Sequence, residues 1–276
     1  MMKSAMIWGA KAIGLWIVLL LGSVAGGMLF LRDVTAVPDT GPLDAGQALL
    51  VVNAGVAAVL ALLAARMRLR GWMLGLVLGG ALFGIETFMA QVETLVFNND
   101  IQMSPATILN VCFAGLLRAA LAGVVVALMW RGRSANGQPA PKALAWKFPV
   151  IGVLYVICYF AAGQFIAWQS PDVRAFYATV GEISRPYLIA VQWVRGLMWA
   201  GIILMLVQAL RGGTWSKALL SGLALSLLMD LQLLYPNPVM PWPVRFPHLI
   251  EVGVSNFVFG LLAAAILLNG GRARSA

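Results

Sequence analysis

The sequence predicts an all-α fold: a polytopic integral membrane bundle of eight transmembrane helices. Hydrophobic residues make up 61% of the chain and charged residues only 11%, whereas a soluble domain carries about 25% charged residues. The apolar residues form long runs, and about 20 such residues cross the hydrocarbon core as a helix. Basic residues gather at alternate ends of these runs. Together these observations predict a single transmembrane domain over residues 1–276.

Eight apolar runs are long enough to span a bilayer, and loops rich in Pro, Gly or charge separate them. The first run also resembles a signal peptide, because small residues follow its apolar core. We interpret it as a retained helix. Proline fixes φ and lacks an N–H, so we expect Pro247 to open the last helix after a stiff, non-helical turn. The expected spans are 13–30, 47–65, 72–97, 105–130, 146–168, 185–210, 218–235 and 247–268.

Lys and Arg cluster at one set of helix ends, and Asp and Glu lie at the other. The positive-inside rule therefore places both termini in the cytoplasm. The net charge of +9 then reflects topology, so we expect a lipid bilayer with anionic headgroups as partner and no nucleic acid. Usage rich in Ala, Gly and Arg favours a bacterial inner membrane. The basic ends contain Lys3, Lys11, Arg66, Arg68, Arg70, Arg131, Arg133, Lys142, Lys147, Arg211, Lys217, Arg272 and Arg274. The acidic ends contain Asp33, Asp39, Asp44, Asp100, Asp172 and Glu182.

A basic loop, 131–144, divides the chain into halves 1–130 and 145–276. One interpretation is a parallel four-plus-four duplication, since halves of four spans would share an orientation. Trp72 and Trp215 open the third and seventh spans. The arginines inside the spans do not correspond between the halves, so the sequence leaves the duplication open.

Charged residues inside the spans indicate contacts within the bundle, because a charge at the bilayer centre costs roughly 2.5–3.5 kcal/mol. At ~1.5 Å per residue, Glu86 lies about 22 Å from the inner end of its helix. Helical side chains lean toward the N-terminus, so we expect Arg118 to reach Glu86 and Arg195 to reach Asp230. These charged residues are Glu86, Glu93, Arg118, Arg195, Asp230 and Glu251.

Two further patterns concern helix faces. Gly79, Glu86 and Glu93 are seven apart and should share one face of the third span, where glycines also permit close packing. Arg245, His248, Glu251 and Ser255 step three, three and four along the last helix. We therefore expect an outward-facing charged cavity between the third, fourth, sixth, seventh and eighth spans. Its expected lining residues are Glu86, Glu93, Arg118, Gln192, Arg195, Asp230, Arg245, His248, Glu251 and Ser255.

Three functions fit these patterns. The first is a transporter or permease for a small anionic or amphiphilic solute, with the arginines on the anion and a carboxyl carrying a coupling proton. The second is a membrane-embedded enzyme for a lipid-linked substrate at the periplasmic face, with His248 and Glu251 as candidate catalytic residues. The third is a non-catalytic subunit of an oligomer or larger complex. The ion pairs could also serve packing alone. We expect no cofactor and no metal site, and the sequence does not decide whether the chain is an enzyme.

Overall fold

The computed structural model describes residues 2–32, 41–98, 103–135, 141–178, 183–237 and 240–269, and side chains from residue 6 onward. The regular structure in these ranges is helical, without β-strands. Eight helical spans are long and apolar enough to cross a membrane, which confirms the predicted fold class. They are Met6–Phe30, Ala45–Arg66, Gly71–Val96, Pro105–Met129, Leu144–Gln169, Arg185–Ala209, Thr214–Leu234 and Trp242–Leu268. The predicted positions of Asp33, Asp39, Asp100, Glu182, Arg272 and Arg274 lie outside the described residues.

The chain forms two compact units. Unit 1 comprises Met1–Ala135 and Leu227–Phe246, and unit 2 comprises Asn136–Ser226 and Pro247–Ala276. Helices α10 (Thr214–Asp230) and α11 (Trp242–Leu268) therefore each contribute to both units. The duplication of the halves 1–130 and 145–276 stays a prediction.

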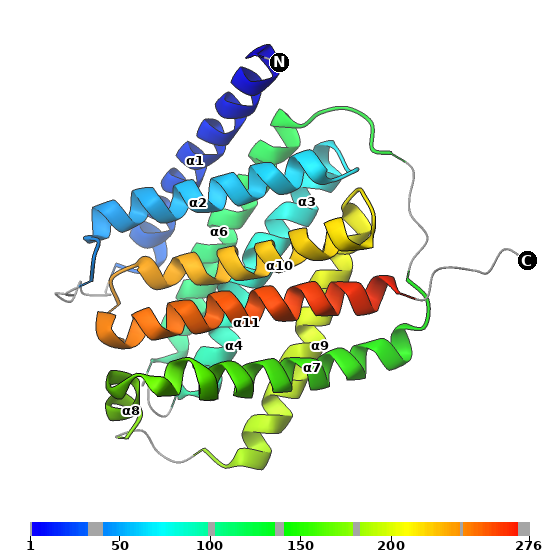
Figure 1. Ribbon diagram of the computed structural model, residues 1–276. Coiled ribbons are helices and arrows are strands. Elements are labelled where there is room, and N and C mark those ends of the chain that lie inside the picture. The colour runs from blue at the N-terminus through cyan, green and yellow to red at the C-terminus, as the bar shows by residue number, and fades with distance from the viewer. Residues whose placement is uncertain are drawn as a thin grey trace, which may run out of the picture. The chain divides into compact units, whose positions relative to one another are not determined.

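In unit 1, α6 packs against α1 and α3, and α1 packs against α2 (Figure 1). Local signals set the helix starts. Asp44 caps α2 by accepting a hydrogen bond from the Gln47 backbone N–H at 2.8 Å, and Ser104 caps α6 just before Pro105. The helical elements that lie wholly within this unit have the following bounds. They are α1 (Met2–Phe30), α2 (Ala45–Arg66), α3 (Gly71–Leu82), the π-helix η1 (Phe83–Phe88), α4 (Met89–Val96), α6 (Pro105–Met129) and the 3₁₀-helix η3 (Leu231–Leu234).

Glycines bring α3 and α6 into backbone contact. A Cβ atom at Gly75 would overlap the Gly123 carbonyl oxygen, and one at Gly79 would lie 3.0 Å from the Ala119 carbonyl oxygen. The predicted packing role is therefore confirmed for Gly75 and Gly79 of the glycine series. This crossing positions the segments of α3, η1 and α6 that carry Glu86 and Arg118.

Unit 2 contains α7 (Leu144–Phe165), the 3₁₀-helix η2 (Ala167–Gln169), α8 (Pro171–Tyr177) and α9 (Arg185–Ala209). Gly152 and Gly196 allow α7 and α9 to touch, because a Cβ at Gly196 would lie 2.7 Å from the Gly152 Cα. Lys147 is buried and donates hydrogen bonds to the carbonyl oxygens of Leu267 at 2.8 Å and Asn269 at 2.5 Å. This predicted topology residue therefore also caps the C-terminus of α11.

The expected start of the last helix is wrong. Helix α11 begins at Trp242, so Pro247 lies inside it and part of the proline-rich turn is helical. Pro243 lies in the first turn, where backbone N–H groups have no intrahelical partner to lose. The backbone N–H groups of Val244 and Arg245 instead donate to the Pro241 carbonyl oxygen, both at 3.0 Å. Residues 238–239 of the predicted turn lie outside the described part.

Candidate functional site

The site begins with a buried ion pair in unit 1. Arg118 on α6 donates through Nη1 to the Glu86 carboxylate, and both side chains are at least nine-tenths buried. The contact expected from helix depth is therefore present. In an apolar interior each charge requires the other, since an unpaired buried ion costs several kcal/mol.

An asparagine fixes the other edge of the guanidinium. Asn53 on α2 is fully buried, and its Oδ1 accepts from Arg118 Nε at 3.2 Å and Nη2 at 2.9 Å. Asn53 Nδ2 in turn donates to the Leu49 carbonyl oxygen at 2.8 Å and the Tyr235 hydroxyl at 3.2 Å. Burial raises the pKa of the Tyr235 phenol, so this hydroxyl stays protonated at neutral pH. Arg118 is thus held by neutral groups as well as by Glu86.

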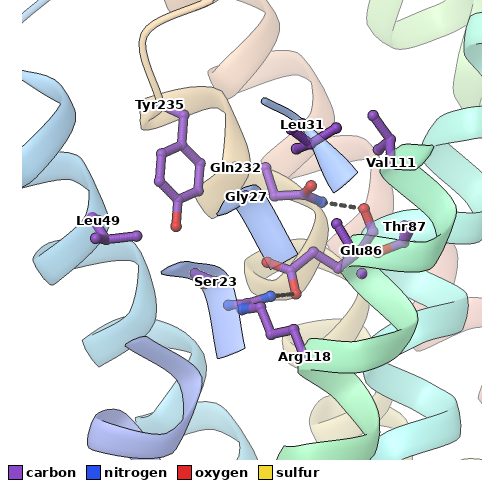
Figure 2. Close-up of a pocket in the computed structure, with 12 residues that line it drawn as sticks. Ser23, Gly27, Leu31, Leu49, Glu86, Thr87, Val111, Arg118, Gln232 and Tyr235 are labelled. Atoms are coloured by element: carbon purple, nitrogen blue, oxygen red, sulfur yellow. Dashed lines mark hydrogen bonds and ion pairs between the residues drawn. The ribbon is translucent and has the colours of Figure 1, made fainter. Parts of the chain in front are cut away.

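Glu86 lies in the π-helix η1, where the Met89 backbone N–H reaches back five residues to the Gly84 carbonyl oxygen. Gln232 Nε2 donates to the Glu86 main-chain carbonyl oxygen at 2.6 Å, which anchors this turn (Figure 2). Such π-turns are frequent at functional sites. The predicted face shared by Glu86 and Glu93 crosses this π-helix and stays a prediction.

A cavity of about 260 Å³ opens beside the ion pair. Figure 2 shows the Glu86 carboxylate and the Arg118 guanidinium facing each other among its lining side chains. It lies toward the end of unit 1 where α1 finishes and α2 and α6 begin, away from the Arg66 end of α2. The first, second, third, fourth and seventh spans contribute to its lining. The predicted contribution of the sixth and eighth spans to a cavity stays a prediction. The lining residues are Ser23, Gly27, Leu31, Leu49, Glu86, Thr87, Val111, Ala114, Gly115, Arg118, Gln232 and Tyr235.

The other predicted residues fall elsewhere. In unit 2, Arg195 Nη1 donates to Gln192 Oε1 at 2.8 Å, and the guanidinium lies 5.6 Å from the Tyr155 ring centroid. Both α9 side chains are buried, as expected for one inward face. The expected contact of Arg195 with Asp230 would join the two units and stays a prediction.

At the start of α11, the structure separates the predicted polar face into distinct interactions. Buried Arg245 donates to the carbonyl oxygens of Leu233 at 3.2 Å and Met240 at 3.0 Å, which ties η3 to the helix start. The predicted place of Arg245 at the rim of a cavity stays a prediction. Ser255 donates to the Val252 carbonyl oxygen of its own helix at 3.3 Å.

A second polar cluster in unit 2 joins Tyr177, His248 and Glu251. His248 Nδ1 lies 2.6 Å from Glu251 Oε2, so the two candidate catalytic residues contact each other. The Tyr177 hydroxyl on α8 lies 3.3 Å from His248 Nε2. In the neutral tautomer that carries its proton on Nδ1, His248 donates a hydrogen bond from Nδ1 to the Glu251 carboxylate. Its Nε2 can then accept a hydrogen bond from the Tyr177 hydroxyl.

Sequence reasoning missed Asn53, Gln232 and Tyr235 as site residues. Asn53 carried a usable signal, since it is an amide in the interior of an apolar span. Gln232 and Tyr235 become site residues only through contacts across more than a hundred residues of chain. No protein-family model matches the chain, and neither a curated protein nor a solved structure matches it.

Proposed function

We propose that this membrane-spanning protein is a transporter or permease for a small anionic solute. The observation that carries the proposal is the buried Arg118–Glu86 pair beside a cavity of about 260 Å³ within helices long enough to span a bilayer. Ionisable groups inside spanning helices commonly mark solute and ion pathways. Arg118 would bind the anionic group of the solute, and the apolar cavity residues would contact its body.

The orientation belongs to the same proposal. With both termini in the cytoplasm of a bacterial inner membrane, the cavity end of unit 1 would face the periplasm. The basic ends of α2 and α3, marked by Arg66, Arg68 and Arg70, support this orientation through the positive-inside rule.

A membrane-embedded enzyme is the second candidate, and one observation favours it. Tyr177, His248 and Glu251 form a continuous hydrogen-bonded series, and a carboxylate that orients an imidazole is a recurring general-base arrangement. The Ser255 hydroxyl donates to the Val252 carbonyl oxygen of its own helix and does not extend this series. The transporter remains the preferred function because the larger polar network surrounds a cavity.

Transport is tested with the purified full-length chain in proteoliposomes and a panel of radiolabelled small organic anions. We expect the wild type to accelerate uptake of at least one anion by tenfold or more over protein-free vesicles (~1.4 kcal/mol per factor of ten). The double variant Glu86→Gln/Arg118→Gln removes both charges at similar volume and should lose this uptake. Arg131→Gln, at an exposed position just after α6, is the control and should keep it. Uptake that persists unchanged in the double variant, or no uptake of any anion, would refute the proposal.

A further inference from the structure

Among the residues that the structure describes, the ion pair leaves the cavity lining without net charge. Glu86 is the sole carboxyl of this described lining and Arg118 its sole base, and the other polar lining groups are neutral. An anion that enters this environment would add an uncompensated negative charge, which costs several kcal/mol away from water. Binding of an anion therefore requires a positive charge to enter with it.

Glu86 can take up that charge as a proton. Protonation neutralises the carboxylate, so it no longer needs Arg118, and the Arg118 Nη1 hydrogens become available to another acceptor. Asn53 Oδ1 meanwhile continues to accept hydrogen bonds from Nε and Nη2 of Arg118. The end-on edge formed by Nη1 and Nη2 would then face the ligand with two donors. Such an edge binds two oxygens of one anion bidentately, as with carboxylates and phosphates.

The described parts of the neighbouring elements add no further charge to the cavity lining. Helix α1 contributes Ser23, α2 places Asn53 on the arginine, and η3 contributes Gln232. Tyr235 is the remaining titratable lining group, and it stays neutral because burial raises its pKa. Asp230 on α10 is a carboxyl of the same unit, but it does not line this cavity.

Size and lining define the anion. A volume of about 260 Å³ corresponds to roughly nine water molecules at about 30 Å³ each. Leu31, Leu49 and Val111 make part of the wall apolar. A single carboxyl in the lining can hold a single proton, so it compensates one negative charge and not two.

We propose that the cavity takes a small monovalent organic anion with a short apolar body, and that each anion enters with one proton that resides on Glu86. The charge balance is complete: the neutral Glu86–Arg118 pair becomes a neutral carboxylic acid beside an arginine–anion pair. This inference rests on the proposed transport function and adds the class of solute and the coupling ion.

The test uses butane-1-sulfonate and the purified full-length protein in weakly buffered detergent solution with a pH-indicator dye. A sulfonate stays ionised at neutral pH, so any proton taken up on binding must reside on the protein. We expect about one proton taken up per sulfonate bound, and an apparent Kd that rises about tenfold per pH unit above neutrality. Ethane-1,2-disulfonate, a dianion of similar length, should bind at least tenfold more weakly (about 1.4 kcal/mol).

Two variants locate the proton. In Glu86→Gln, sulfonate binding should persist without proton uptake and without pH dependence, whereas Asp230→Asn should behave as the wild type. If Glu86→Gln does not fold, the proton uptake of the wild-type protein on sulfonate binding still tests the coupling. Sulfonate binding without proton uptake would overturn the coupling and leave anion transport intact. Absence of sulfonate binding, or equal affinity for the disulfonate, would overturn the solute class. Failure of all anions in the proteoliposome assay would instead refute the transport function.

Discussion

Replacing Arg118 alone with glutamine should lower the free energy of unfolding by about 3–5 kcal/mol, because it leaves the Glu86 carboxylate buried without a counter-ion. At roughly 2–4 °C per kcal/mol, the melting temperature should fall by on the order of 10 °C. Thermal unfolding of purified protein in detergent, followed by intrinsic tryptophan fluorescence, measures this change.

The double variant Glu86→Gln/Arg118→Gln separates lost charge from lost packing. It removes both ions and retains amides that can hydrogen-bond, so it should recover most of the stability lost in the single variant. Arg131→Gln at an exposed position should change stability by no more than about 0.5 kcal/mol. A single variant as stable as wild type, or a double variant as unstable as the single one, would contradict the buried-pair account.

Enlarging Gly75 should separate α3 from α6. In Gly75→Leu, the new Cβ alone would overlap the Gly123 carbonyl oxygen, and backbone atoms cannot yield as a flexible side chain can. We expect the free energy of unfolding to fall by about 3 kcal/mol or more, at the upper end of overpacking effects. The same unfolding assay measures it.

Gly80→Leu is the matched control for this change. Gly80 lies on the same helix, is exposed, and has nothing within 4 Å of an added Cβ. It should be neutral or stabilising, because leucine favours a helix over glycine by up to about 1 kcal/mol. Equal destabilisation by both substitutions would show that the α3–α6 contact is not responsible.

The sequence was sufficient for the spans and for one central contact. Apolar runs and breakers located each span to within a few residues at most ends, because a bilayer demands length and hydrophobicity that few other structures share. Depth counting paired Arg118 with Glu86 because a helix has a fixed rise per residue and few buried charges compete.

The rest depends on tertiary structure. The π-turn at Glu86 shifts the helix register by one residue. Tertiary contacts accompany it: Thr87 packs against Gly115, and Gln232 donates to the Glu86 carbonyl oxygen. Neither contact leaves a local pattern. Helix α11 begins before Pro247 because Arg245 and the Pro241 carbonyl oxygen stabilise its first turn, which proline rules alone do not include.

The most direct test of the site is the position of a bound anion. Crystals of the full-length protein with 3-bromopropane-1-sulfonate, measured at the bromine absorption edge, would locate the ligand independently of activity. We predict a single anomalous peak in the unit 1 cavity, with the sulfonate within hydrogen-bond distance of Arg118 Nη1 and with Glu86 displaced from that atom. A peak beside His248 instead, or an intact Arg118–Glu86 contact with the anion bound elsewhere, would contradict the account.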